Sequence, residues 1–585
     1  MDRKVAALTA AEFDVLVIGG GAFGAAAARE AALRGLNTAL IEREDFGAGA
    51  SSECFKMVHG GIRYLQHLDF PRLRASAHER SAFLRIAPHL VNPLPIAIPT
   101  FGYGRKGKAF LGAGARVYDL CTIDRNRGIS DPRRQIHRSQ RLSRADVLSL
   151  FPHLDSPDLT GAVVFEDGQM YNPARLVLAF VRAAVDLGAA AANYVAAERF
   201  LWEGSTVRGV RARDAITGDT FDIRARVTLN AAGPWADYLL KDPEHFPAHR
   251  RLPFSRDAYF VVDRKPTSEF AVAVQALSRD KDALFARATR HLFAVPWHDK
   301  TLIGVWHRLW SDAPDTAHVT EEEIETWVHE LNTVYPTLHL KNSEVCFAHC
   351  GLVPFGETAT ETELSFGKKS RVTDHRADGV GGLVSLAGIR YTTARIDSAE
   401  ALELLLQQFK GAYRQIDASL STRMPLPGGD IENFSEFERR AQRHSSRLVT
   451  ASAMRSLLRN HGTRYAEVLE CANGDTSLVP QSDTLVAEIR HAVEQEMAAR
   501  LEDVIMRRTD LGAGRHPGEA AVGFVAGEMA KILAWSPQRL SDEIKRTRSV
   551  LDLHRAKVTT YSDREPTTLP NTSVSTGPTL ATVPA

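Results

Sequence analysis

The sequence predicts a mixed α/β body followed by an all-helical domain, and three observations support this prediction. The chain begins with an apolar run at residues 13–18, a glycine turn and an alanine-rich stretch of good helix formers at 22–33. Strand-like apolar runs and amphipathic helical stretches alternate from there to about residue 408. Beyond a Pro/Gly break at 425–429 the sequence becomes helical and rich in Arg and Glu.

Length and composition indicate a soluble enzyme with several packing units. The chain has 585 residues, of which 44% are hydrophobic and 24% charged, and its formal net charge is +1. This charge gives no reason to expect a nucleic acid partner. The five cysteines do not form a secreted disulfide framework, so we expect a cytoplasmic protein. His349 lies between Cys346 and Cys350, but a second ligand pair does not follow at zinc-site spacing, and we predict no metal.

The glycine turn has the spacing of a dinucleotide-binding motif. Gly19, Gly21 and Gly24 form G-x-G-x-x-G after the first strand and at the start of the helix. The first glycine permits the bend, the second lets the backbone approach a pyrophosphate, and the third allows the helix to pack closely on the strand. Glu42 ends the next apolar run, where its carboxylate accepts from ribose hydroxyls and disfavours a 2′-phosphate. The pattern predicts a Rossmann-like βαβ unit; the alternative is a glycine turn that only packs tightly.

Three further stretches favour FAD over NAD. A Gly/Ser-rich segment follows Glu42 and suits backbone that lies along an extended dinucleotide and a ring system. A later strand ends in a glycine, and near residue 388 a strand, a glycine turn and a helix start follow one another. A helix N-terminus there would stabilise the anionic edge of a reduced flavin. The cofactor-binding residues expected in these stretches are Ser51, Ser52, His59, Gly60, Gly61, Gly233, Gly388, Arg390 and Thr392.

Together these stretches resemble the FAD-dependent glycerol-3-phosphate dehydrogenase family, within the D-amino-acid-oxidase-like flavoproteins. The resemblance is carried by VIGGGAFG, SSECFKMVHGGIRYL, NAAGPWAD, FAVPW, TLIGVW and LAGIRYTTAR. It implies non-covalent FAD and a substrate sheet over the flavin. It also implies hydride transfer from C2 of sn-glycerol 3-phosphate to flavin N5, which yields dihydroxyacetone phosphate. Electrons would pass to quinone at the cytoplasmic face of a membrane.

From these observations we expect a Rossmann-like FAD-binding domain interleaved with a mixed-sheet substrate domain, plus a C-terminal all-helical domain. The FAD-dependent oxidoreductase domain would span 12–408, and the helical domain 425–552. A Thr/Ser/Pro-rich tail at 555–585 would be disordered. Within the first domain, the cofactor-binding parts are expected at about 12–100, 160–240 and 345–408, and the substrate parts at about 101–159 and 241–344.

The resemblance also assigns substrate-binding residues, and here the chain departs from the family. Arg63 and Arg371 match two arginines that hold the substrate phosphate, and Tyr64 follows Arg63 as in the family. Arg390 stands where the family has lysine and keeps the positive charge. Val353 stands where an arginine is expected, Tyr259 where a histidine is expected, Ile389 where a glycine is expected, and Cys54 and Phe55 where serines are common. The flavin-binding parts are therefore retained while the substrate-binding parts differ.

The general base for the hydroxyl proton has several candidates. His59 lies within the cofactor motif and is the first choice, although a structural histidine that contacts the flavin is an open alternative. His298 and His307 are the other candidates. Tyr259 is expected to donate a hydrogen bond to the substrate, because a phenol with a pKa near 10 is a poor base.

Two questions about partners and reaction class stay open at this point. Residues 102–120 combine Arg105, Lys106, Lys108 and Arg116 with Phe110, Leu111 and Tyr118, which is consistent with a peripheral membrane-docking surface or with a solvated loop. An oligomer is equally open. The competing functions are an FAD oxidase acting on an amine or a non-phosphorylated polyol, supported by Val353, and a flavin-binding protein without activity. Retention of Arg63, Arg371 and Arg390 favours an active enzyme.

Overall fold

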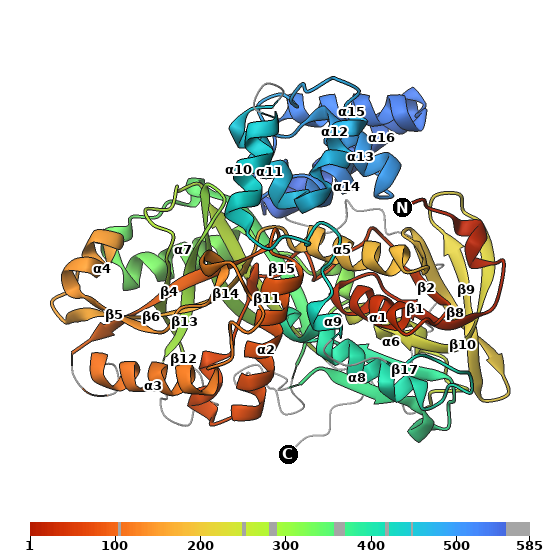
Figure 1. Cartoon of the computed structure of the whole chain (residues 1–585), viewed down its shortest axis with the longest axis horizontal. Helices are drawn as coiled ribbons and strands as arrows, with labels where there is room; N and C mark the ends of the chain where they lie inside the picture. Colours follow the sequence, from red (N-terminus) through yellow and green to blue (C-terminus); the bar gives the residue numbers. More distant parts are fainter. Residues whose placement is uncertain are drawn as a thin grey trace, which may run out of the picture.

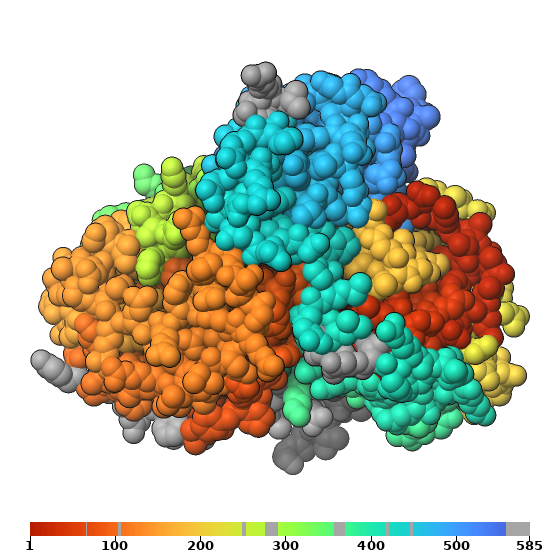
Figure 2. All heavy atoms as spheres, viewed as in Figure 1, coloured from red at the N-terminus to blue at the C-terminus, as the bar shows by residue number. Residues whose placement is uncertain are grey.

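Two β-sheets form the body of the molecule, and a helical domain packs across them (Figure 1). The computed structural model describes residues 1–556 except 103, 105–106, 248–252, 280–288, 356–368, 416–419 and 446–448. The predicted tail therefore lies outside the described residues apart from Arg555 and Ala556. In Figure 2 the helical domain, coloured cyan to blue, lies against both lobes of the body.

The first sheet carries the glycine motif and is parallel at its centre. Its strand order is β16-β17-β10-β1-β2-β7, and β9 and β8 extend it as an antiparallel ribbon from β10. One face packs against α1, α5 and α8, and the other against the β8–β9 ribbon, so its central strands are buried on both sides. The elements are β1 (Phe13–Ile18), α1 (Ala22–Leu33), β2 (Thr38–Ile41), α5 (Pro173–Asp186), β7 (Ala190–Ala192), β8 (Val195–Glu203), β9 (Thr206–Asp214), β10 (Thr220–Asn230), α6 (Ala236–Leu239), β16 (Arg371–Asp374), β17 (Leu383–Ala387) and α8 (Ala394–Leu406).

The second sheet is mixed and lies beside the first. Its order is β15-β11-β14-β13-β12-β4-β6-β3, with β5 paired to β6. Helix α7 (Glu321–Val334) covers one face, where Trp327 stacks with Trp306 and Phe260. Its remaining elements are β3 (Met57–Val58), α2 (Phe70–Ile86), β4 (Val91–Phe101), α3 (Lys108–Cys121), β5 (Gln140–Ser143), α4 (Arg144–Leu150), β6 (Leu159–Met170), β11 (Phe254–Val262), β12 (Ala271–Arg279), β13 (Thr289–Trp297), β14 (Lys300–Trp310) and β15 (Val345–Pro354).

The predicted α/β class, the interleaving and the helical C-terminal domain are confirmed. The chain crosses between the two sheets several times, as Figure 1 shows. Strands β4, β6 and β15 pair within the second sheet, although the sequence placed most of their residues in the cofactor-binding parts. An apolar run alone does not say which sheet it will join, because pairing partners are distant in sequence.

The C-terminal domain is made of helices that pack on a buried face of the second sheet. Apolar side chains of β11 and β14, such as Val261 and Leu302, share a core with Val525 and Leu551 of this domain. A salt-bridge network also joins it to the first sheet, because buried Asp45 accepts from Arg507 and Arg508 at 2.7 Å each. The helices are α9 (Leu420–Arg423), α10 (Phe434–Ser445), α11 (Ala451–His461), α12 (Tyr465–Cys471), α13 (Val486–Gln495), α14 (Leu501–Asp503), α15 (Glu519–Leu533) and α16 (Pro537–His554).

The expected docking surface at 102–120 is only partly at the surface. Phe110 is 50% exposed and Arg116 is exposed, but Tyr118 is 2% exposed and its hydroxyl accepts from Arg80 at 2.8 Å. The expectation was wrong for Tyr118, because it lies on the inner face of α3, whereas Phe110 and Arg116 lie on the outer face. Arg105 and Lys106 lie outside the described residues, while Lys108 and Leu111 are half-buried.

Candidate active site

A cavity of about 720 Å³ lies where the two sheets meet. The glycine turn after β1 and the end of β2 line one part, and β11, β14 and β15 of the second sheet line another. Sites for cofactors and small ligands usually have volumes of about 300–1,000 Å³. The sequence-predicted residues that line this cavity are Gly19, Gly21, Glu42, Ser51, Cys54, Phe55, His59, Gly61, Arg63, Tyr64, Gly233, Tyr259, His307, Val353, Gly388, Ile389, Arg390 and Thr392.

The glycine turn is shaped so that backbone, and not side chains, faces the cavity. Gly19 has a φ of +103°, and a Cβ there would lie 2.5 Å from the carbonyl oxygen of Ala231. A Cβ on Gly24 would lie 1.8 Å from the carbonyl oxygen of Gly19, so this glycine packs behind the turn without lining the cavity. Gly21 is the N-cap of α1, and the next N–H, of Ala22, donates to the Ser51 hydroxyl at 2.9 Å. A helix N-terminus with close backbone approach fits a pyrophosphate.

Glu42 lies at the end of β2 with its carboxylate held in place. Its Oε2 accepts from the N–H of Gly20 at 2.6 Å, and its Oε1 accepts from the N–H of Glu44 at 2.9 Å. Burial raises the pKa of Glu42, and the two backbone N–H groups oppose that rise. Because the side chain lines the cavity, its oxygens can also accept from the ribose hydroxyls of a dinucleotide.

Two later segments close on this turn from the other side. A Cβ on Gly388, which follows β17, would lie 2.1 Å from the ring of Phe23 in the first turn of α1. The backbone N–H of His59 donates to the Thr392 hydroxyl at 3.0 Å, which joins the 57–61 segment to the start of the helix. Gly60 does not line the cavity, because it packs against Arg80 and its N–H donates to Asp167 at 2.5 Å.

Lys56, which the sequence did not single out, supports the wall of the cavity. It is 4% exposed, and its ammonium donates to the Tyr259 hydroxyl at 2.8 Å and to the Ser52 carbonyl at 3.0 Å. Burial lowers the pKa of Lys56. The Tyr259 hydroxyl donates to the Cys54 carbonyl at 3.0 Å, and burial raises the pKa of Tyr259 well above 10. Ser52 thus supports the loop through its carbonyl and lies behind the cavity surface.

Three arginines gather around Tyr64 at one end of the cavity. Arg390 donates to the Tyr64 hydroxyl at 2.9 Å and to Ser76 at 3.2 Å, and its buried Nε lacks a hydrogen-bond partner within the part of the chain that the structure describes. The guanidinium of Arg72 lies 4.1 Å from the centre of the Tyr64 ring. Arg63, Arg72 and Arg390 all line the cavity and are called the arginine cluster below.

The arginine cluster concentrates positive charge at this end of the cavity. Burial lowers the pKa of Arg72, and repulsion from Arg390 and Arg63 lowers it further, against the opposing effects of Tyr64 and Asp69. Asp69 is its ion-pair partner at 3.1 Å. His59 is also close to these positive charges. Its pKa is lowered to about 3, first by burial and then by repulsion from Arg390 and Arg63. Arg72 was missed because it lies nine residues after Arg63 and outside the motif. The direction of α2 places its side chain at the cavity.

Arg371 is placed apart from the arginine cluster. It begins β16, where its backbone pairs with Ala387, and it is not among the described residues that line the cavity. Its role as a phosphate ligand remains a prediction. Val353 on β15 does line the cavity, so the position expected to carry an arginine contributes an apolar side chain there.

The three histidines considered as general bases differ in whether they line the cavity. His307 on β14 lines the cavity, and its Nδ1 lies 2.7 Å from Asp257 Oδ1 on β11. His298 lies in a turn, with its ring 4.3 Å from that of Tyr171 and its Nε2 3.4 Å from the Tyr171 carbonyl, and it is not among the described residues that line the cavity. Of the three candidate bases, His59 and His307 therefore face the cavity.

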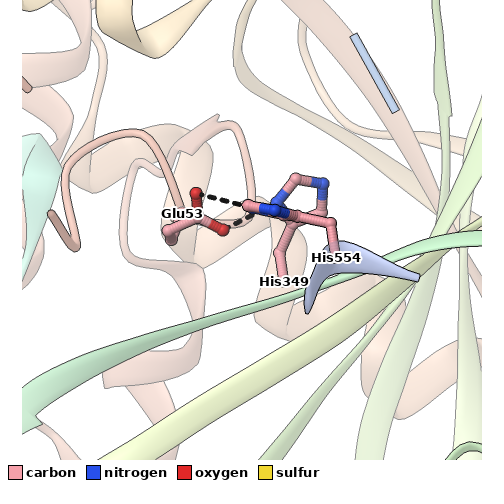
Figure 3. Close-up of side chains that lie close together, drawn as sticks. All are labelled: Glu53, His349 and His554. Atoms are coloured by element: carbon pink, nitrogen blue, oxygen red, sulfur yellow. Dashed lines mark hydrogen bonds and ion pairs between the residues drawn. The ribbon is translucent and has the colours of Figure 1, made fainter. Parts of the chain in front are cut away.

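His349, which lies between Cys346 and Cys350 in sequence, takes part in a different contact. Its Nδ1 lies 2.7 Å from Glu53 Oε2, and Nε2 of His554 lies 3.2 Å from Glu53 Oε1 (Figure 3). Burial opposes ionisation of Glu53, yet the two histidines hold its pKa well below the usual value. These three residues, called the carboxylate–histidine cluster, come from the loop between β2 and β3, from β15 and from the last turn of α16.

Comparison with known proteins agrees with this architecture. Residues 14–390 match the family described as FAD dependent oxidoreductase, and residues 419–540 match the C-terminal domain of alpha-glycerophosphate oxidase. A glycerol-3-phosphate dehydrogenase of Mycobacterium leprae is 31% identical over 547 residues, which cover 91% of this chain and 87% of that protein. One from Synechocystis sp. is 28% identical over 548 residues, which cover 91% of this chain and 95% of that protein.

A solved structure shows the same fold. The glycerol-3-phosphate dehydrogenase from Bacillus halodurans complexed with FAD matches with a TM-score of 0.71 and 24% identity, over 94% of this chain and 98% of that chain. Because the family match spans well over half of the chain and the relatives match it almost end to end, the chain belongs to the FAD-dependent oxidoreductase family and, within it, to the glycerol-3-phosphate dehydrogenases.

Proposed function

We propose that this protein uses FAD to oxidise sn-glycerol 3-phosphate to dihydroxyacetone phosphate and passes the electrons to quinone. The observation that carries the proposal is the arginine cluster, which lines the same cavity as the glycine turn. One end of the cavity therefore suits a dinucleotide and another suits an anion.

The residues around the glycine turn fit FAD. Gly21 and the N-terminus of α1 would hold the pyrophosphate, and Glu42 would hold the ribose. Gly61, Gly388 and Thr392 would lie along the flavin, because these segments meet beside the second sheet. When bound, FAD supplies an acceptor for a hydride.

The arginine cluster would hold the substrate phosphate. A guanidinium presents a planar fork of donors to phosphate oxygens, and each charged contact contributes about 1.5–3 kcal/mol. Arg63 was expected in this role together with Arg371, which does not line the cavity among the described residues. Arg390, expected to keep the positive charge of the family lysine, and Arg72 place two further guanidiniums at the same end. The cluster compensates for Val353, where the family arginine is missing.

The same charge argues against an amine substrate. Three guanidiniums close to one another repel an ammonium group, and Arg72 pairs with Asp69 at 3.1 Å. A substrate whose only charge is an ammonium group is therefore disfavoured. The geometry favours a phosphorylated alcohol.

The test is reduction of the bound flavin. Protein purified with its flavin is mixed anaerobically with sn-glycerol 3-phosphate, and the visible absorbance of the flavin is followed; glycerol is the matched uncharged substrate. We expect rapid bleaching with the phosphate ester and little with glycerol. Equal bleaching by glycerol at the same concentration would contradict the assignment of the arginine cluster to the substrate phosphate. If neither compound bleached the flavin, the proposal that sn-glycerol 3-phosphate is the substrate would be contradicted.

Delivery of electrons to quinone requires contact with a membrane, and one surface suits it. Helix α3 and the adjoining residues expose large apolar side chains beside Arg116: Leu68 51%, Phe70 41%, Phe110 50%, Val117 43%, Leu120 72% and Ile123 73%. Such a surface can insert into the boundary of an anionic bilayer. Among the helices that the structure describes, none is both long and apolar enough to cross a membrane.

Vesicle binding tests this surface. The double variant Leu120→Glu, Ile123→Glu should lose co-sedimentation with phosphatidylglycerol vesicles and keep bleaching by substrate. Leu187→Glu is the matched control, because Leu187 is 37% exposed at the end of α5. Equal binding of both variants would contradict the assignment of α3.

A further inference from the structure

Asp257 and His307 are direct neighbours across the sheet that faces the cavity. They are register partners in the antiparallel pair β11 and β14, and both side chains line the cavity. His307 Nδ1 lies 2.7 Å from Asp257 Oδ1, and the Ser255 hydroxyl donates to the same oxygen at 2.6 Å. The side chain of His307 is 16% exposed and that of Asp257 is 28% exposed. The carboxylate is therefore fixed by two donors and in turn fixes the imidazole.

This hydrogen bond determines which ring nitrogen can take a proton. Because a carboxylate only accepts, Nδ1 of neutral His307 carries the hydrogen, and the lone pair is on Nε2. A carboxylate behind an imidazole holds the tautomer and stabilises the imidazolium that forms when Nε2 is protonated. The pair thus has the arrangement of an oriented general base.

The other candidates are less suited to this step. His59 lies among Arg390, Arg63, Arg80 and Arg72, which together with burial make its imidazolium unfavourable. The proton of Tyr259 is donated to the Cys54 carbonyl, and its oxygen accepts from Lys56. Efficient proton transfer needs a base whose protonated form is stable near the working pH. Of these groups, His307 is the one whose hydrogen-bond partner stabilises its protonated form.

We propose that His307 is the general base of the reaction and that Asp257 is its positioning residue. This inference rests on the proposed oxidation of an alcohol. As the substrate's O–H bond breaks, its proton goes to Nε2 of His307. The C2 hydrogen leaves with its electron pair to the bound flavin, and the carbon–oxygen double bond forms from the electrons of the broken O–H bond. The imidazolium then returns its proton to solvent.

Charged and titratable groups lie near His307 on three strands of the second sheet. On β11, Asp257 and Tyr259 line the cavity, while Arg256 is turned to the far face, where it pairs with Glu323. Arg308 follows His307 on β14 and pairs with the same Glu323. His291 on β13 lines the cavity as well. Of these groups, Asp257 makes the 2.7 Å contact, so its removal should change the pH response most.

The experiment measures the anaerobic rate of flavin reduction by sn-glycerol 3-phosphate between pH 5 and 9. His307→Asn should lower the rate constant about 10²- to 10⁴-fold. Asp257→Asn should lower it less and move the acidic limb of the profile to lower pH, because the imidazolium loses its carboxylate. In His307→Ala, added imidazole should restore part of the rate. His298→Asn is the control, since His298 is exposed outside the cavity and has a φ of +52° that asparagine tolerates.

Two readouts separate the base role from other roles. Binding of dihydroxyacetone phosphate to the oxidised protein, followed by calorimetry, should be unchanged in His307→Asn. In protein labelled with ¹³C at histidine Cε1, the titrating signal that disappears in His307→Asn should move in Asp257→Asn. Unchanged reduction rates in His307→Asn, with normal bleaching of the parent protein, would overturn this inference alone. A parent protein that sn-glycerol 3-phosphate does not bleach would instead overturn the proposed function.

Discussion

Single residues determine how the cavity receives an anion. Arg72 stacks on Tyr64, pairs with Asp69 and is repelled by two other guanidiniums. A bound phosphate would offset this repulsion, because its negative charge attracts all three guanidiniums. The cluster is therefore less favourable without a substrate than with one.

Replacing Arg72 by glutamine should weaken substrate capture more than chemistry. Loss of one charged contact of 1.5–3 kcal/mol predicts a KM for sn-glycerol 3-phosphate about 10- to 100-fold higher, with kcat within about 3-fold. Arg74→Gln is the matched control on the same helix, since Arg74 is exposed and pairs with Asp124. Steady-state kinetics with both variants measures the difference. A KM that does not change in Arg72→Gln would remove Arg72 from the phosphate site.

Residues of the cofactor motif were predictable, and those of the substrate end were less so. Gly19, Gly21 and Gly24 follow a local pattern whose reason is backbone geometry, so one sequence suffices. Arg72 and the Asp257–His307 pair depend on helix direction and strand register, which a local pattern does not contain. Asp257 and His307 are fifty residues apart in sequence, so their contact cannot be predicted until the register of β11 and β14 is known.

At the scale of elements, the cofactor end depends on three segments that meet at small residues. The turn after β17 packs against the first turn of α1, where Gly388 contacts the ring of Phe23. The 57–61 segment is tied to Thr392 by one hydrogen bond. Periodicity and glycine spacing predicted β1, α1, β2, β10, β17 and α8. They did not predict the sheet to which β4 and β15 belong, since pairing is long-range.

Gly388→Ala should lower the affinity for FAD. Its Cβ would lie 2.1 Å from the Phe23 ring, so the ring or the turn must move, and both border the cavity. We expect FAD to bind about 5- to 150-fold more weakly, corresponding to the 1–3 kcal/mol typical of an overpacked site. Flavin content after gel filtration and fluorescence titration of the apoprotein measure this change.

The control and the rescue follow from the same geometry. Gly114→Ala on α3 has nothing within 4 Å of the added Cβ and should bind FAD normally. In the double variant Phe23→Ala, Gly388→Ala the clash is removed, and part of the affinity should return. Full retention of FAD by Gly388→Ala alone would mean that this contact does not shape the cofactor site.

At the scale of the whole molecule, the carboxylate–histidine cluster joins the C-terminal domain to the active site. Glu53 lines the cavity, whereas His554 ends α16. His554 Nδ1 lies 2.8 Å from the Val550 carbonyl, which only accepts, so that nitrogen carries a hydrogen. Nε2 must then also be protonated to donate to Glu53 at 3.2 Å. The contact is therefore an ion pair between an imidazolium and a carboxylate.

The pKa shifts of His349 and Glu53 determine how the stability of the folded protein changes with pH. Burial lowers the pKa of His349 to about 4 from 6.5, so the unfolded chain binds more protons than the folded protein in that window. Stability is thus lost as pH falls from 6.5 toward 4. The depressed pKa of Glu53 acts in the same sense: its contribution is present above its unfolded value of 4.5 and is lost as pH falls through its lower folded value. Acid should loosen the domain contact.

Replacing His554 by alanine should weaken FAD binding indirectly. The substitution removes a contact to Glu53 in the loop between β2 and β3, and this loop lines the cavity. Glu53 would lose its charged partner while staying buried beside His349, and loss of one partner from a buried pair typically costs several kcal/mol, here reduced because His349 remains. We expect the temperature at which the flavin is released, followed by its fluorescence, to fall at pH 7. The difference from the parent protein should shrink only below pH 4.5, as Glu53 becomes protonated. His444→Ala, an exposed position on α10, should behave as the parent protein. If His554→Ala released flavin at the parent temperature at every pH, the C-terminal domain would not support the cofactor site through this contact.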